Sequence, residues 1–298
     1  MQIDKFLEAE GDAGEQQALD VIENLRQAGK LRAFGNVRQI PKRLYSLEEL
    51  RLNNIDATKF LSPSDDKLAR IRTYCQFGLL SGITALSAIA QLQVTDTIVI
   101  LFIAITIAVT DQVANGGGFE ALALDAIARL VESEYGPRVA AHEAAHFLIA
   151  YLTGLLPRRY TLSSLDAWRR YGAFNVQAGT QFCDSAFQRE VQGGKMSSSS
   201  LDRYSCVALA GVAEEYVKYG LAEGGKNDVM QLDSLLRALQ FTQAKADGQI
   251  RWAVLNITSI LRRHKDVHAK LAAAMSASKP VSECIAVIES GLADSDDI

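Results

Sequence analysis

The stretch from residue 139 to residue 156, VAAHEAAHFLIAYLTGLL, constrains this chain more than any other. It contains His142, Glu143 and His146 in an H-E-x-x-H pattern, among Ala, Phe, Leu and Ile residues that favour a helix. Residues four apart share one face of a helix, so the two imidazoles can bind a single metal ion. A catalytic zinc ion keeps one position open for water, which the neighbouring glutamate could reach. The pattern predicts a zinc site with Glu143 within reach of its bound water.

A catalytic zinc site needs a third protein ligand. The downstream candidates are Glu214, Glu215 and Asp228. Asp228 follows a glycine pair, Gly224 and Gly225, where the backbone can approach another group closely. The same position also suits an Asp that caps the N-terminus of a helix, and from local sequence both interpretations remain open.

The bulk composition excludes some classes of partner. The 298 residues carry a net charge of −4 with a pI of about 5.7, so no basic surface points to nucleic acid as a partner. The four cysteines contain no C-x-x-C pair and indicate ordinary thiols in a reducing compartment. The first twenty residues are acidic, which is unlike a secretory signal or a transit peptide, so we expect neither at this end.

Composition and periodicity divide the chain into three parts. Residues 1–72 form an N-terminal helical segment, residues 73–114 a hydrophobic helical hairpin, and residues 119–298 a compact domain. Within the first part we expect a helix at residues 15–29 and a second helix that opens with a capping box at Ser46 and Glu49. No chemistry is expected there.

The hairpin is the candidate membrane segment. Residues 73–95 and 97–110 carry no charged side chain, and only Asp96 separates them. A bilayer span needs about 20 apolar residues. The first run is long enough but contains several polar residues, and the second is more apolar but short. Basic residues precede the hairpin and none lies at its tip, residues 91–97, which favours both ends on the cytoplasmic-type side. The alternative is a hairpin buried inside a soluble domain.

The fold class predicted for the compact domain is mainly α with a small β element. Residues 119–134 are an amphipathic helix, two strands are expected at 159–165 and 173–182, and residues 193–200 form a loop whose last serine caps the next helix. Further helices are expected at residues 201–219, 228–246, 249–275 and 280–290. His264 and His268 form a second pair four residues apart, but surrounding Lys and Arg residues predict a solvated helix face rather than a metal site.

Three segments carry a family resemblance. HEAAH is followed by ALAGVAEEYVKYG at residues 208–220 and by GGKNDVMQLDSLL at residues 224–236. In this order they resemble the peptidase domain of the FtsH family of membrane-bound zinc proteases, over about residues 119–290. The resemblance implies a helical zincin-type peptidase fold and a zinc ion bound by His142, His146 and Asp228. It also implies that Glu143 is the catalytic base and that Glu215 supports the site or its packing.

The chain departs from the family pattern in ways that bear on function. Ala145 and Val212 replace a glycine and an arginine of the family motifs, and the AAA ATPase domain is missing. Residues 220–227, GLAEGGKN, fit G-x-x-x-x-G-K but end in Asn where Ser or Thr must hold magnesium, so no ATP binding is expected. The chain therefore resembles the ATPase-less FtsH-like proteins of plastids and cyanobacteria, which implies a plastid, thylakoid or cyanobacterial membrane.

The function predicted from the sequence is that of a membrane-tethered zinc metalloendopeptidase. Its substrates would be unfolded or membrane-associated proteins or peptides, bound extended along a strand within residues 159–182, and it would assemble as a homo-oligomer or with FtsH-like subunits. A scaffold or assembly factor of a membrane complex that keeps the metal site is the alternative. An intramembrane protease is disfavoured, because charged residues flank the H-E-x-x-H helix and leave too short an apolar run.

Overall fold

The computed structural model describes residues 3–9, 11–64, 66–172, 179–296 and 298. Within these residues the chain forms sixteen helices and two strands, so the prediction of a mainly helical fold is confirmed. The chain divides into two compact units, each described by itself. The larger unit comprises residues 1–64, 137–160 and 180–298; the hairpin unit comprises residues 65–136 and 161–179.

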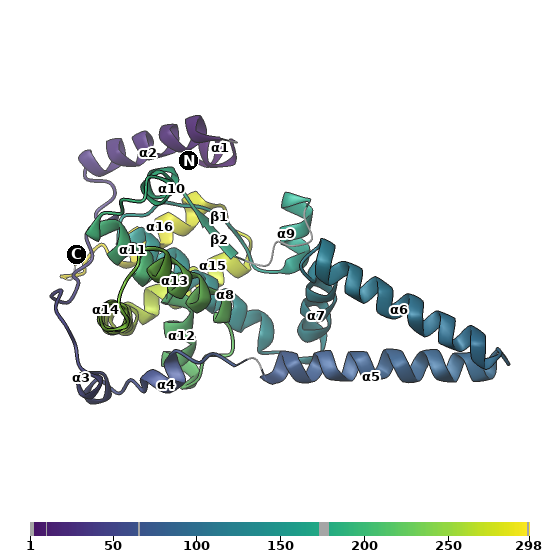
Figure 1. Cartoon of the computed structure of the whole chain (residues 1–298). Helices are drawn as coiled ribbons and strands as arrows, with labels where there is room; N and C mark the ends of the chain where they lie inside the picture. The colour runs from purple at the N-terminus through teal and green to yellow at the C-terminus, as the bar shows by residue number, and fades with distance from the viewer. Residues whose placement is uncertain (1–2, 10, 65, 173–178, 297) are drawn as a thin grey trace. The chain divides into compact units, whose positions relative to one another are not determined.

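Helix α8 (Tyr135–Leu152), which carries the H-E-x-x-H pattern, lies in the middle of the larger unit (Figure 1). Every residue from 140 to 152 is buried, on all faces of the helix. A helix that is apolar all round can only be stable when surrounded by other elements. Its polar residues are therefore buried among packed helices, where each must find a partner.

The N-terminal segment belongs to the larger unit and contacts the C-terminal end of α8. The backbone amides of Gly35 and Val37 donate hydrogen bonds to the carbonyls of Tyr151 and Leu152, in the last turn of the helix. The predicted capping box is present at the N-terminus of α3. The helices of this segment are α1 (Ile3–Glu8), α2 (Asp12–Gln27), α3 (Leu47–Leu52) and α4 (Ala57–Phe60).

The helices after residue 184 differ in their boundaries from the sequence-based prediction. The single helix expected at 201–219 is divided at Leu209, and its first part begins earlier, with Ser197 rather than Ser200 as the N-cap. Where the sequence predicts two helices, at 228–246 and 249–275, the structure has three. The set is α10 (Ser185–Gln192), α11 (Ser198–Ala208), α12 (Ala210–Tyr219), α13 (Lys226–Ala238), α14 (Gln243–Arg263), α15 (Lys265–Ser276) and α16 (Val281–Gly291).

The solvated face predicted for His264 and His268 is wrong, because both side chains are buried, each with 4% of its surface exposed. The helix breaks at His264, and α15 then buries one of its faces. The residues of that face are Val267, His268, Leu271 and Met275. The surrounding Lys and Arg side chains project from the rest of the helix, so a local excess of positive charge did not indicate exposure at these positions.

Two strands, β1 (Pro157–Thr161) and β2 (Gly179–Phe182), pair in a two-stranded sheet (Figure 1). The first predicted strand ends at Thr161, because Ser163 caps helix α9 (Ser164–Tyr171), which the sequence analysis did not predict. Residues 173–178 of the second predicted strand lie outside the described residues. Its remaining residues form β2, next to helix α8.

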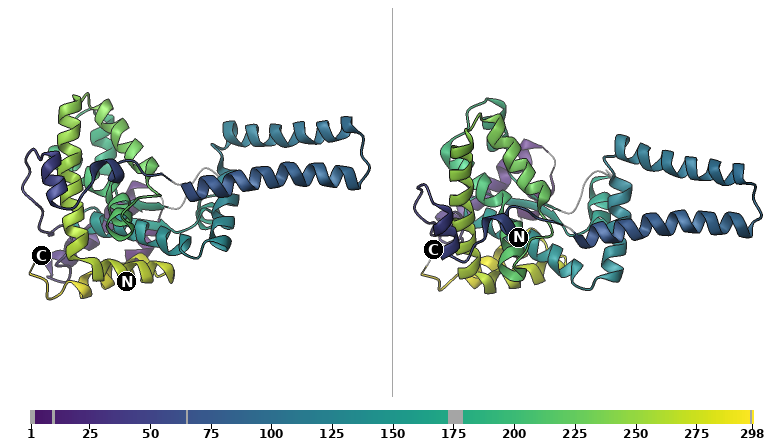
Figure 2. Two further views of the ribbon diagram at one scale, coloured as in Figure 1. Left: turned by 90° about the horizontal axis from the view of Figure 1, so that it is seen from below. Right: turned by 60° about the horizontal axis from the view of Figure 1, so that its bottom comes forward.

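The hairpin unit contains two long antiparallel helices, α5 (Asp66–Ile89) and α6 (Val94–Ala114), with α7 (Gly118–Val131) and α9 packed near their base (Figures 1 and 2). By length and composition, α6 is able to cross a membrane. The carboxylate of Asp111 accepts hydrogen bonds from the amides of Phe119 and Glu120, and so caps the first turn of α7. Large apolar side chains along both hairpin helices are exposed in this structure.

We expect residues 73–114 to insert into a bilayer as a hairpin, so that tags on the N- and C-termini lie on the same side of the membrane. The motivation is the exposed apolar surface of α5 and α6, together with basic residues only at the start of α5. Protease digestion of sealed vesicles should leave both tags protected or remove both. Protection of a single tag would indicate one span, and extraction by carbonate would indicate none.

Candidate metal centre

Three side-chain atoms of the larger unit converge on one point. Nε2 of His142 lies 3.1 Å from Nε2 of His146 and 3.2 Å from Oδ2 of Asp228. Nε2 of His146 lies 3.4 Å from the same oxygen. Ligands at about 2.0–2.1 Å from a tetrahedral zinc ion are about 3.3–3.4 Å apart. The three atoms therefore have the separations that one zinc ion needs, and two imidazoles with a carboxylate are a donor set that zinc accepts.

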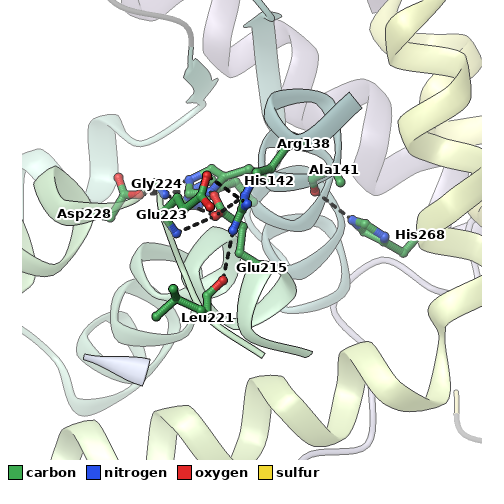
Figure 3. A network of polar contacts seen from close by, with 10 residues as sticks. Arg138, Ala141, His142, Glu215, Leu221, Glu223, Gly224, Asp228 and His268 are labelled. Atoms are coloured by element: carbon green, nitrogen blue, oxygen red, sulfur yellow. Dashed lines mark hydrogen bonds and ion pairs between the residues drawn. The ribbon is translucent and has the colours of Figure 1, made fainter. Parts of the chain in front are cut away.

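The ring of His142 is oriented by Glu215 on helix α12 (Figure 3). Nδ1 of His142 donates to Oε1 of Glu215 at 2.8 Å, which leaves Nε2 facing the candidate metal position. The other oxygen, Oε2, accepts from Nε of Arg138 at 2.7 Å and from the amides of Glu223 and Gly224. Both carboxylate oxygens are thus engaged. Such a partner fixes the tautomer and the orientation of a metal-binding histidine.

A backbone carbonyl orients the second histidine. Nδ1 of His146 donates to the carbonyl of Val207 at 2.8 Å. Val207 lies in the last turn of α11, where the regular helix hydrogen bonds end, and its carbonyl also accepts from the amide of Leu209. The division of the predicted 201–219 helix at Leu209 therefore provides the acceptor that turns Nε2 of His146 toward Asp228.

Asp228 is the third residue of α13, and Gly225 is the residue that caps this helix, so the N-cap interpretation of Asp228 is wrong. Gly225 has φ +84°, a left-handed conformation that side chains disfavour. A Cβ there would lie 2.4 Å from Cγ2 of Val212 and 3.1 Å from Cε1 of His142. Glycine at this position thus lets the turn approach the ring of His142 and brings the carboxylate of Asp228 to the cluster.

Attraction between the histidines and the carboxylates shifts the pKa values of the cluster. Burial lowers the pKa of His142, but its hydrogen bonds to Asp228 and Glu215 and the charge of Glu143 outweigh burial and raise the pKa to about 10. Burial raises the pKa of Asp228, but the two imidazoles outweigh it and hold that pKa well below its usual value. Likewise the pKa of Glu215 falls to about 2, through His142 and two backbone amides that outweigh burial. Zinc has to displace protons from such histidines, so its affinity should fall as the pH falls.

Glu143 lies beside the cluster and makes a different contact. Its carboxylate Oε2 accepts a hydrogen bond from Oγ1 of Thr180 at 2.9 Å. Thr180 belongs to β2, so this strand runs directly past the residue that the sequence predicts as the base. The negative charge of Glu143 acts on both histidines. Glu143 thus lies close to the candidate metal position but is not one of the three converging groups. This is the placement that a general base needs.

Of the three candidates for the third ligand, only Asp228 reaches the two Nε2 atoms. Glu215 binds the opposite nitrogen of His142, and Glu214 faces His268 instead. The sequence analysis did not single out Thr180 or Gly211. A Cβ on Gly211 would lie 2.2 Å from Nε2 of His142, so the ring packs directly on the backbone of α12. A glycine inside an otherwise good helical sequence was the available signal for this close approach.

No protein family model matches the chain, and no curated protein and no solved structure matches it significantly. The inference about function therefore depends on the geometry of the metal centre and on the sequence motifs that form it.

Proposed function

We propose that this chain is a zinc metallopeptidase of the FtsH-like, helical zincin type, tethered to a membrane by its hairpin, with no ATPase domain between the hairpin and the metal-binding domain. The observation that carries the proposal is the convergence of His142, His146 and Asp228 at the spacing of a zinc site, with Glu143 beside them. By the resemblance of its motifs, we place it in a plastid, thylakoid or cyanobacterial membrane.

Several residues of the chain have separate roles in the proposed peptide hydrolysis. His142, His146 and Asp228 would hold a zinc ion, which when bound would lower the pKa of a water molecule and polarise the scissile carbonyl. Glu143 accepts a proton from the attacking water and delivers it to the leaving amine as the C–N bond breaks. Thr180 holds the carboxylate of Glu143 in place through its hydroxyl. Glu215 and the carbonyl of Val207 keep both imidazoles turned toward the metal position.

The substrate is proposed to bind as an extended segment alongside β2. In the described part of the chain this strand pairs only with β1, which leaves its other edge for a peptide backbone. Thr180 places the strand next to Glu143, so a peptide added to this edge would pass close to the base. An extended backbone is available in unfolded proteins and in peptides, which are therefore the substrate class that we expect.

The metal assignment is tested by replacing Asp228. We expect the purified wild-type chain to contain one zinc ion and Asp228→Ala to lose most of it, because two histidines alone do not complete the site. Asp233→Ala is the matched control: Asp233 lies on the same helix, its side chain is 51% exposed and it pairs with Arg237. Elemental analysis after dialysis measures both. Full zinc in Asp228→Ala, with loss in Glu214→Gln or Glu215→Gln, would show that the third ligand is misassigned.

Activity is tested with an unfolded casein-type substrate and a peptide library. We expect slow cleavage that ATP does not change. A zinc-loaded wild type that cleaves neither substrate would favour the alternative function, a scaffold or assembly factor in a membrane complex. Stimulation by ATP would show that residues 220–227 bind nucleotide. We do not expect it, because the amides of Glu223 and Gly224 donate hydrogen bonds to Glu215.

A further inference from the structure

His268 makes a buried contact with the metal-binding helix from the side opposite the zinc ligands (Figure 3). Its Nε2 donates a hydrogen bond to the carbonyl of Ala141 at 2.8 Å. Ala141 directly precedes His142, so this carbonyl belongs to the peptide unit that leads into the first ligand. Inside a helix such a carbonyl already accepts the hydrogen bond of the amide four residues later. The hydrogen bond from His268 is an additional one, and it ties this turn of α8 to α15.

Glu214 lies at the other nitrogen of the same imidazole. Its Oε1 is 3.5 Å from Nδ1 of His268, and the two side chains are 11% and 5% exposed. A carbonyl oxygen only accepts, so Nε2 of His268 carries a proton toward Ala141. The carboxyl group of Glu214 lies against the other ring nitrogen and so limits how far the buried ring can turn.

Glu214 and Glu215 are consecutive on α12, and consecutive side chains on a helix point about 100° apart. Glu215 reaches the ring of His142 directly, through Nδ1. Glu214 reaches the backbone of the same turn indirectly, through His268 and Ala141. One turn of α12 therefore holds both the side chain and the main chain of the first zinc ligand.

We propose that Glu214 and His268 are positioning residues of the metal centre, which fix the rotation and height of α8 so that His142 meets His146 and Asp228 at coordination distance. This inference rests on the proposed metal-binding function. A ring nitrogen lies about 6 Å from its helix axis, so a rotation of α8 by about 10° displaces it by about 1 Å. Metal sites need their ligands held within about 0.5 Å. A contact to the carbonyl of Ala141 resists such a rotation.

The test compares His268→Ala with His264→Ala in the full-length chain. The two histidines are equally buried, at 4% exposure each, and so the variants remove similar packing. Zn²⁺ affinity is measured by chelator competition, the geometry of the site by the visible absorption of bound Co²⁺, and stability by thermal unfolding of the metal-free protein. We expect His268→Ala to weaken Zn²⁺ binding about tenfold and to change the Co²⁺ spectrum. His264→Ala should alter only the melting temperature.

Two further variants distinguish positioning from packing. His268→Gln keeps an N–H donor for the carbonyl of Ala141, and we expect it to restore most of the Zn²⁺ affinity lost in His268→Ala. Glu214→Ala and His268→Ala should be non-additive, because both residues act through one contact. The inference is overturned if His264→Ala weakens Zn²⁺ binding as much as His268→Ala does. It is also overturned if His268→Ala binds Zn²⁺ and Co²⁺ like the wild type. A wild-type chain that binds neither metal overturns the proposed function and this inference together.

Discussion

Replacement of Glu143 by Gln should reduce peptide cleavage by about 10²–10⁴-fold while the zinc content stays unchanged. Glutamine has nearly the same shape but cannot take a proton from the attacking water. In the structure Glu143 is not one of the three converging ligand groups, and its carboxylate is held by the hydroxyl of Thr180. Cleavage of an unfolded protein and elemental analysis, made on the same preparation, measure the two quantities separately.

Glu134→Gln is the matched control for this variant. Glu134 is an exposed glutamate shortly before α8, and its replacement should change neither zinc content nor cleavage. Loss of zinc in Glu143→Gln would mean that Glu143 is a ligand and that the division of roles is wrong. Retention of both zinc and full cleavage would mean that another group accepts the proton.

Replacement of Gly211 by Ala should disrupt the candidate metal centre and abolish tight Zn²⁺ binding. The added methyl group would lie 2.2 Å from Nε2 and 2.4 Å from Cδ2 of His142. The ring cannot move away without breaking its hydrogen bond to Glu215, and the backbone of α12 is buried. We expect at least a hundredfold loss of Zn²⁺ affinity, and a loss of folding stability of about 1–3 kcal/mol, typical of an overpacked core. Chelator competition and thermal unfolding measure these effects.

Gly82→Ala serves as the control for Gly211→Ala. Gly82 lies within α5, and a Cβ there would have no atom within 4 Å. Alanine favours helix over glycine, so this change should leave Zn²⁺ affinity intact without loss of stability. Unchanged Zn²⁺ affinity in Gly211→Ala would indicate that α12 can move away from His142 and that the close approach is not needed for binding.

Much of the helical content follows from local patterns. Apolar periodicity and terminal residues predict the capped helix at Ser46, the hairpin helices and the amphipathic helix at residues 119–134, because these signals act within a few residues. The boundaries after residue 184 could not be predicted in the same way. The break at Leu209 lies in a sequence that suits continuous helix, and the sequence alone does not show that the carbonyl of Val207 is needed by His146.

His264 and His268 illustrate the limit of local charge patterns. Four basic residues around them indicate a solvated face, and yet both imidazoles are buried, His264 at the break before α15 and His268 within it. Burial of a titratable side chain depends on which partners surround it, such as Glu214 and the carbonyl of Ala141 for His268. Those partners are 54 and 127 residues away in the chain, and no short window contains them.

For the metal centre, the sequence by itself determined the pair of histidines and the adjacent glutamate, because a helix places residues four apart on one face. Local sequence could not choose among Glu214, Glu215 and Asp228 as third ligand, and only the family resemblance favoured Asp228. The tertiary structure brings its carboxylate across 86 residues to within 3.2 Å of His142. It also places Thr180, Gly211 and His268 around α8. The physical reason is that coordination and close packing depend on distances between separate elements, which chain folding sets and local propensity does not.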